Sequence, residues 1–413
     1  MRHREGTHGE ARQSNRGISF AFDTPAEALA DLLDRLAPLD PEEVLLAQAS
    51  GRVLAESIVA DRPSPACDVS AMDGYALRVG DAPAKLPVLC EVETGQAPPA
   101  LPARSAARIF TGGALPEQGE AVLRREQVIE APDHIVVPQG LRVKRGQNIR
   151  YRGENADQGD VVVRAGAVMH PGRAAAAAIF GLRRVRVYRR VRIGLVVTGN
   201  EVVSSGQPRP VEVVDANGPS LMSLLAAIPF AEVVGVSHVP DDPLETRGAL
   251  LSLLERCDAV WVTGGVSLGD HDYVPRAVSA VAKVVFHGLP VRPGKPILAA
   301  LHAERKLILG LPGNPVSVMV GARRIGLEAV RKLAGANGQL IAPAVQLEED
   351  DEKTLGLWWY RPVMRTREGS AVLLPSKGSG DVVAAAASDG FIELPPNAAG
   401  LGPWPFYPWG MEG

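Results

Sequence analysis

The segment 193–335 places the strongest constraint on the fold, because short apolar runs alternate there with amphipathic stretches. This alternation is typical of a mostly parallel sheet with helices on both faces. The pattern predicts strands at 193–197, 231–236, 259–262 and 307–309 and helices at 219–228, 243–256 and 316–333. The sequence therefore predicts a doubly wound α/β domain, to which we assign residues 191–335.

The rest of the 413-residue chain has other patterns, and its length allows several domains. Helical spacing after Thr24 and Pro25 predicts a first helix. Short apolar runs broken by Gly and Pro predict a β-rich domain over 61–143 and a small β domain over 336–413. Residues 1–17 are polar and basic, and we expect a disordered tail rather than a secretory signal.

Net charge, apolar run length and cysteine spacing exclude several classes of protein. A net charge of −3 predicts no general affinity for nucleic acid. Valine alternates with arginine over 183–192, which fits either a nucleic-acid patch or an edge strand whose charges block unwanted pairing, and we favour the edge strand. The longest apolar run, near 174–182, is too short to span a membrane, and the three cysteines are widely spaced. We expect a cytoplasmic protein with reduced thiols.

Ligands of an open parallel sheet bind outside the carboxyl ends of its strands. Five polar loops follow the predicted strands and should converge on one rim: 198–201, 215–218, 240–242, 262–273 and 310–315. In the fourth loop, Gly264 and Gly265 allow close approach of an anion, and Ser267 adds a hydroxyl donor.

Two further features favour an anion. Asn314 followed by Pro315 starts a helix, whose free N–H groups attract negative charge. Arg292 and Lys295 place two cations on a stiff turn, which suits a phosphate or another oxyanion.

Four carboxylates would lie near the same anion: Glu201, Asp215, Asp241 and Asp272. They would repel it unless a divalent cation lay between, and Mg²⁺ commonly binds one or two carboxylates plus phosphate oxygens. Alternatively, Asp215 and Asp241 support turns and helix caps, the role that we prefer for Asp242. We interpret His271 as a loop residue without a metal.

Several long motifs, in order, resemble the molybdopterin molybdenumtransferases of the MoeA type, which are also represented by the E domain of gephyrin. The matching segments are 68–76, 109–114, 146–150, 263–269, 292–296 and 310–317. The resemblance implies a homodimer of elongated four-domain subunits with a C-terminal β-barrel-like domain. It also implies that the first helical segment packs with 147–192 around the inserted β domain, so that 18–60 and 144–190 form one domain.

The resemblance further implies a reaction in which adenylated molybdopterin (molybdopterin-AMP) and molybdate, with Mg²⁺, give molybdenum cofactor and AMP. Molybdopterin adenylyltransferase would be the upstream partner. The family's catalytic positions fall on Asp68 and Thr111 in the β domain and on Glu201, Asp241 and Asp272 in the α/β domain. The two groups are expected to meet across the subunits of the dimer.

The remaining site residues are also carried over from the resemblance. Glu201 and Asp272 would hold the metal. Gly264, Gly265 and Ser267 would hold the pterin or its phosphate, and Arg292 with Lys295 would neutralise phosphate or molybdate. The other expected binding residues are Asp215, Pro312, Gly313, Asn314 and Pro315.

The chain departs from the family pattern at two places. Asn155 stands where the family has aspartate, and Cys67-Asp68-Val69-Ser70 replaces the usual Phe-Asp-Asn-Ser. These departures motivate a second hypothesis, a molybdopterin-binding carrier or scaffold with weak catalysis. A third and weaker hypothesis is a Mg²⁺-dependent phosphohydrolase.

Overall fold

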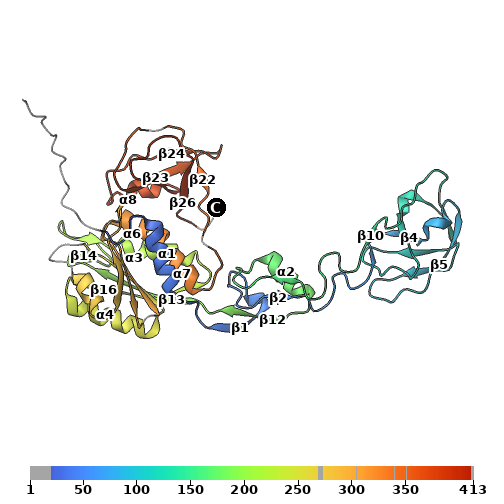
Figure 1. The fold of residues 1–413 in the computed structure, drawn as a ribbon, viewed down its shortest axis with the longest axis horizontal. Helices are drawn as coiled ribbons and strands as arrows, with labels where there is room; N and C mark the ends of the chain where they lie inside the picture. Colours follow the sequence, from blue (N-terminus) through green and yellow to red (C-terminus); the bar gives the residue numbers. More distant parts are fainter. Residues whose placement is uncertain (1–19, 268–272, 304, 339, 350, 411–413) are drawn as a thin grey trace, which may run out of the picture.

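A computed structural model describes residues 20–267, 273–303, 305–338, 340–349 and 351–410 of an elongated molecule. The α/β part and the C-terminal β part lie together at one end, and a second β part lies at the other (Figure 1). A small part that contains helix α2 (Pro171–Ile179) lies between the two ends. Within the described residues, no helix is long and apolar enough to cross a membrane.

The α/β part contains a six-stranded sheet, which confirms the predicted doubly wound domain. Its order is β16 (Ala231–Val239), β13 (Val191–Thr198), β17 (Ala259–Thr263), β21 (Lys306–Leu311), β20 (Leu298–His302) and β18 (Lys283–His287). The first four strands are parallel to one another, whereas β20 pairs antiparallel with both of its neighbours. The carboxyl ends of the parallel strands therefore meet at one edge.

Helices cover both faces of this sheet, because its strands are apolar on both sides. On one face, Ile193 and Leu195 share a core with the helices α1 (Pro25–Arg35), α3 (Asn217–Ala226), α6 (Pro315–Gly321) and α7 (Leu327–Leu333). On the other face, Val196 and Val262 share a core with α4 (Pro243–Arg256) and α5 (Tyr273–Ser279). A π-helical turn at Ala322–Gly326 joins α6 to α7, so the predicted helix 316–333 is present with one local irregularity.

The packing predicted for the first helix is wrong. Thr24 caps α1 through a capping box with Glu27, but the helix packs on α7 of the α/β part rather than on 147–192 (Figure 1). Ala28, Leu29 and Leu32 are buried in the α/β core. The apolar face of α1 requires burial but carries no signal that specifies its partner.

The central part combines segments from both sides of the inserted β domain. The strand β1 (Pro41–Leu45) pairs antiparallel with β12 (Arg184–Tyr188), and β2 (Ile58–Val59) pairs with β11 (Val161–Val163). The chain thus leaves and re-enters this part along neighbouring strands.

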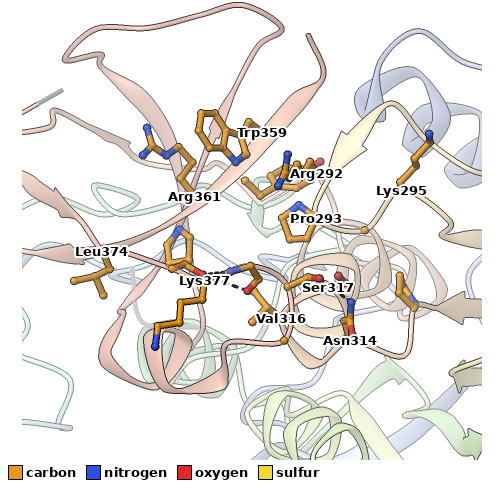
Figure 2. A pocket seen from close by; sticks show the side chains of 18 of the residues that line it. Arg292, Pro293, Lys295, Asn314, Val316, Ser317, Trp359, Arg361, Leu374 and Lys377 are labelled. Atoms are coloured by element: carbon orange, nitrogen blue, oxygen red, sulfur yellow. Dashed lines mark hydrogen bonds between the residues drawn. The ribbon is translucent and has the colours of Figure 1, made fainter. Parts of the chain in front are cut away.

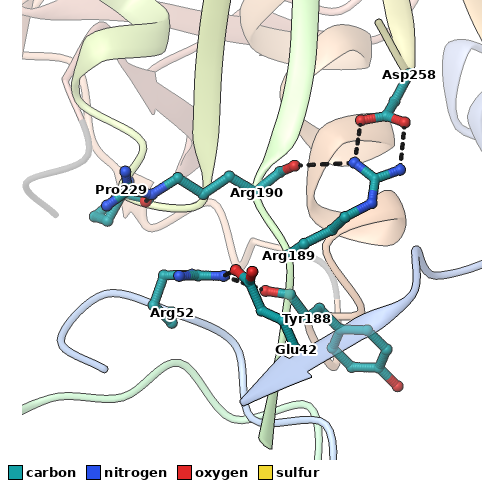
Figure 3. Close-up of polar contacts among 7 residues, drawn as sticks. All are labelled: Glu42, Arg52, Tyr188, Arg189, Arg190, Pro229 and Asp258. Carbon is teal, nitrogen blue, oxygen red and sulfur yellow. Dashed lines mark hydrogen bonds and ion pairs between the residues drawn. The ribbon is translucent and has the colours of Figure 1, made fainter. Parts of the chain in front are cut away.

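Three of the six arginines in 183–192 contact carboxylates, which favours the edge-strand interpretation over a nucleic-acid patch. Arg184 contacts Glu43, and Arg186 contacts Glu56. Arg189 donates two hydrogen bonds, of 2.8 and 2.7 Å, to Asp258 at the joint with the α/β part (Figure 3). At the same joint Arg190 donates to the Pro229 carbonyl at 3.1 Å.

The distant part contains the predicted β-rich fold. Its sheet has the order β7 (Ala121–Arg124), β4 (Gly74–Leu77), β6 (Ala106–Ile109), β5 (Lys85–Val92), β9 (His134–Val136) and β8 (Ile129–Glu130). A separate pair, β3 (Val69–Ser70) with β10 (Ile149–Arg150), lies where the chain enters and leaves this part.

The C-terminal part is barrel-like, as predicted. Its strands follow the order β19 (Val291–Arg292), β23 (Trp358–Arg365), β25 (Gly390–Leu394), β26 (Trp404–Pro408) and β22 (Ala344–Val345), and β24 (Ala371–Leu373) pairs with β23. A bridge between Leu347 and Ala371 brings the ends of this sheet together. Because β19 belongs to this sheet, the turn that follows Arg292 lies between the two parts.

Candidate active site

The loops predicted to converge do line one cavity, of about 750 Å³, at the carboxyl ends of the parallel strands. We call it the acidic cavity. Its described lining includes Glu201, Asp215 and Asp241 and no lysine or arginine. The strand-end rule therefore located the cavity from the sequence.

The two glycines after β17 form one wall of the acidic cavity. Gly264 has φ +91° and Gly265 has φ +58°, in the left-handed region that favours glycine. A Cβ atom at Gly264 would lie 2.5 Å from Oγ1 and 2.6 Å from the carbonyl oxygen of Thr198. A side chain is therefore excluded there by both conformation and space, so backbone lines the cavity.

Asp215 supports the start of α3 rather than offering a free carboxylate. One of its oxygens accepts from the backbone N–H groups of Asn217 and Gly218, both at 2.9 Å, and the other lies 2.9 Å from His238 Nε2. Its side chain is only 5% exposed. This geometry favours the capping alternative for Asp215, and Asp242 likewise caps α4.

Asn217 is a site residue that the sequence prediction missed. Its Nδ2 donates to Thr263 Oγ1 at 3.2 Å and to the Gly313 carbonyl at 2.8 Å. The side chain thus ties the start of α3 to the loops after β17 and β21. The only local signal for this role in the sequence is the position of Asn217, two residues after Asp215 at the end of a strand.

The other two described carboxylates are more available. Asp241 accepts a hydrogen bond from the Asn200 backbone N–H, and its own N–H donates to Asn200 Oδ1, each at 3.2 Å. These two bonds connect the loops that carry Asn200 and Asp241. Glu201 is exposed on the loop that carries Asn200. No described residue donates a hydrogen bond to its carboxylate. Asp272, His271 and Asp270 lie outside the described residues.

A metal at this rim would depend on more than the described side chains. Across the ranges that the structure covers, no three His, Cys, Asp or Glu residues are grouped so that they could hold a metal ion. Glu201 and Asp241 line the acidic cavity, and no described lysine or arginine lines it with them. This donor set fits Mg²⁺ that takes one or two carboxylates and completes its shell with phosphate oxygens and water.

A second cavity, of about 1270 Å³, adjoins the first between the α/β and C-terminal parts. We call it the basic cavity, because its described lining has five basic and only two acidic side chains. Figure 2 shows Trp359 and Arg361 on one wall and Asn314, Val316 and Ser317 on the other. The predicted residues Ser267, Arg292, Lys295, Pro312 and Gly313 also line it.

The cations of the basic cavity differ in their partners. Arg292 and Lys377 form no ion pair with a carboxylate in the described part of the chain. The Lys295 ammonium lies 5.6 Å from the centroid of the Phe20 ring, toward the N-terminal segment (Figure 2). Arg292 therefore faces the cavity as predicted, whereas Lys295 is partly engaged by an aromatic face.

Arg361 is the most constrained cation of the set. Its two terminal nitrogens donate to the two oxygens of Asp351 at 2.8 and 2.6 Å, and Lys353 contacts the same carboxylate at 3.0 Å. The guanidinium carbon of Arg361 lies 4.2 Å from the centroid of the Trp359 ring. These hydrogen bonds, above all those from Arg361, hold the pKa of Asp351 well below its usual range.

The two cavities share four residues: Gly265, Gly313, Asn314 and Gly380. At this boundary Asn314 Nδ2 donates to Ser379 Oγ at 2.7 Å, and the Val316 N–H donates to the Ser379 carbonyl at 3.0 Å. Asn314 and Pro315 begin α6 as predicted. However, the expectation of free N–H groups there is wrong for Val316, whose N–H is already used.

Asp68 directly precedes β3 and Thr111 follows β6, so both belong to the distant β part, whose β4 and β5 lie at the opposite end of the molecule from the α/β part (Figure 1). Asp68 accepts from the Arg152 backbone N–H at 2.8 Å. Thr111 donates to Asp73 through its N–H at 2.7 Å and its hydroxyl at 2.8 Å, and these bonds lower the pKa of Asp73. A single chain therefore does not bring the two predicted catalytic groups together.

Comparison with known proteins accounts for most of the chain. Residues 24–181 match the family described as the MoeA N-terminal region (domain I and II), and residues 194–332 match the family described as a probable molybdopterin binding domain. A molybdopterin molybdenumtransferase of Haemophilus influenzae is 33% identical, over 75% of this chain and 77% of its own length. That of Synechococcus elongatus is 31% identical, over 87% and 91%.

A solved structure agrees with the fold. The crystal structure of the molybdopterin biosynthesis moeA protein from Pyrococcus horikoshii is 28% identical to this chain, with a TM-score of 0.78. The match covers 92% of this chain and 97% of that one.

Proposed function

Since the chain belongs to the MoeA-type molybdopterin molybdenumtransferases, we propose that it inserts molybdate into adenylated molybdopterin and releases AMP. The observation that carries the proposal is the meeting of an acidic and a basic cavity at Gly265, Gly313, Asn314 and Gly380. A phosphorylated substrate with a divalent cation and a separate oxyanion requires such a division of charge.

The acidic cavity is the proposed place for Mg²⁺ and the phosphates. Glu201 and Asp241 would hold the ion, with Asp272 as the further predicted ligand. When bound, Mg²⁺ offsets charge on the phosphoanhydride. The backbone at Gly264 and Gly265 lets the anion approach closely, since no side chain intervenes.

The basic cavity is the proposed place for molybdate. Arg292 and Lys377 offer positive charge and form no ion pair with a described carboxylate, and Ser317 adds a hydroxyl. Cationic donors arranged before the reaction lower the cost of bringing a second anion next to a phosphoanhydride. Molybdate in this cavity would lie next to the boundary with the cavity proposed for the phosphates.

A second copy of the chain would complete the site. Asp68 and Thr111 are too far from the cavities of their own subunit to act there, so the proposal requires a homodimer in which they reach the partner's cavities. Molybdopterin adenylyltransferase would supply the adenylated substrate.

The direct test is an incubation of the purified protein with adenylated molybdopterin, molybdate and Mg²⁺. AMP should be released in proportion to the enzyme, and Asp272→Ala should abolish the release. A folded, dimeric preparation that releases no AMP above background would contradict the proposal.

One observation favours a second function, that of a molybdopterin carrier with weak catalysis. Asn155 Oδ1 accepts a hydrogen bond from Arg150 at 2.7 Å, so a neutral amide stands beside this arginine. Binding of the pterin without AMP release would favour the carrier. Asn155→Asp separates the two cases, because a gain in turnover indicates an enzyme with a weakened site rather than a dedicated carrier.

A further inference from the structure

The Arg361–Asp351 pair lies within the basic cavity, and both side chains line it. The contact is bidentate, with nitrogen-to-oxygen distances of 2.8 and 2.6 Å. A carboxylate in this position presents two oxygens to the guanidinium fork, as a tetrahedral oxyanion would. Asp351 therefore already occupies donors that an incoming oxyanion would use.

The surroundings keep the arginine in this position. Trp359 stacks on the Arg361 guanidinium, and the Arg361 side chain is only 11% exposed, whereas the Asp351 side chain is 31% exposed. The arginine is thus fixed by packing, while the aspartate lies at the accessible edge of the cavity. Lys353 contacts the same carboxylate, so one aspartate engages two of the five basic side chains.

We propose that Asp351 is an internal competitor that limits oxyanion affinity in the basic cavity by occupying Arg361 and Lys353. An oxyanion that binds to the Arg361 fork displaces the carboxylate toward solvent, and the carboxylate returns when the oxyanion leaves. Asp351 is a residue that sets affinity and does not take part in the chemistry. The inference rests on the proposed function, since it takes the basic cavity as the molybdate site.

Calorimetric titration with sodium molybdate tests the inference on the full chain. Asp351→Asn removes the charge but keeps the shape and one acceptor for Arg361. It should bind molybdate about three- to tenfold more tightly than the wild-type protein at low salt, because a nearby negative charge is gone. The gain should shrink as salt is added, since the competing charge is partly exposed.

Asp31→Asn is the matched control. Asp31 also forms a bidentate pair with an arginine, Arg35, at 2.8 Å for both contacts, and its side chain is likewise 31% exposed. It lies on α1 and does not line the basic cavity. This variant should bind molybdate as the wild-type protein does.

A second comparison shows whether the gain depends on Arg361. Arg361→Met should bind molybdate weakly, and adding Asp351→Asn to it should restore little of the affinity. Unchanged or weaker binding by Asp351→Asn alone would overturn the inference and indicate that the aspartate positions Arg361 for the oxyanion. If neither the wild-type protein nor Asp351→Asn binds molybdate, the oxyanion role of the cavity fails together with the inference.

Discussion

Asn314 donates a hydrogen bond to Ser379 Oγ at 2.7 Å, at the boundary where the acidic and basic cavities meet. The asparagine begins α6 of the α/β part, and the serine belongs to the C-terminal part. The Val316 N–H donates to the carbonyl of the same serine at 3.0 Å. The C-terminal part therefore forms a wall of the proposed site.

Removing this hydroxyl should weaken both oxyanion binding and the contact between the two parts. In Ser379→Ala the loop that carries Lys377 loses one of its two bonds to α6, at a cost of about 0.5–1.5 kcal/mol. We expect the apparent KM for molybdate in the AMP-release assay to rise severalfold. Ser376→Ala is the control, because Ser376 bonds only within its own loop. Equal effects of the two variants would contradict the assigned role.

A methyl group at Gly264 should disable the acidic cavity. In Gly264→Ala the new Cβ atom would lie 2.5 Å from Thr198 Oγ1, so the loop must move. Gly95→Ala is a matched control, since Gly95 also has positive φ (+82°) but a Cβ atom there would meet nothing within 4 Å. We expect backbone strain to cost each variant about 1 kcal/mol of folding free energy, and the clash to cost Gly264→Ala more. Loss of AMP release should be confined to Gly264→Ala.

The buried Arg324–Glu393 pair should govern the stability of the junction between the α/β and C-terminal parts. The contact is 2.7 Å, and the two side chains are 11% and 7% exposed. Glu393→Gln leaves the arginine charge uncompensated and should cost about 3 kcal/mol in urea unfolding. Glu212→Gln, which breaks a pair with the exposed Arg209, should cost less than about 1 kcal/mol. A similar cost for both would show that the junction depends on other contacts.

Thr111→Val should raise the pKa of Asp73 toward its ordinary value. The hydroxyl bond is lost, but the backbone N–H of residue 111 still donates, so the change is partial. A lowered folded-state pKa contributes stability above the unfolded pKa, which is lost as pH falls through the folded pKa. In the variant the contribution should be smaller, and its loss should be complete at a higher pH. NMR titration of Asp73 measures the shift, and Asp381, which accepts from backbone N–H groups of Lys377 and Ala384, should titrate unchanged.

The parts of the fold that local patterns determine were predictable from the sequence. Helix α4 has the predicted bounds, because Asp242 caps it and Pro243 starts it. Strands β13, β17 and β21 followed from apolar runs that are buried on both faces. Because these strands were expected to run parallel, their carboxyl ends predicted the position of the acidic cavity.

Long-range packing was not predictable from local patterns. The apolar face of α1 is evident in the sequence, but its partner α7 is about 300 residues away in the chain. The sequence prediction missed three residues of the basic cavity, Arg361, Asp351 and Ser379, because no motif marks them. They reach the cavity through the pairing of β19 with β23 and through the loop after β24. Asp68 and Thr111 were assigned through the resemblance alone, and they stay a prediction, since neither residue lines the acidic or the basic cavity of its own chain.

We propose that one active site combines Asp68 of one subunit with Glu201 of the other, and mixing two inactive variants tests this pairing. Asp68→Ala and Glu201→Ala should each release little AMP when pure. After the two are unfolded together and refolded, half of the dimers should carry one intact site. AMP release should then recover to about a quarter of the wild-type rate, as random pairing in a two-fold dimer requires. Mixed dimers, verified by differently tagged chains, that show no recovery would contradict the shared site.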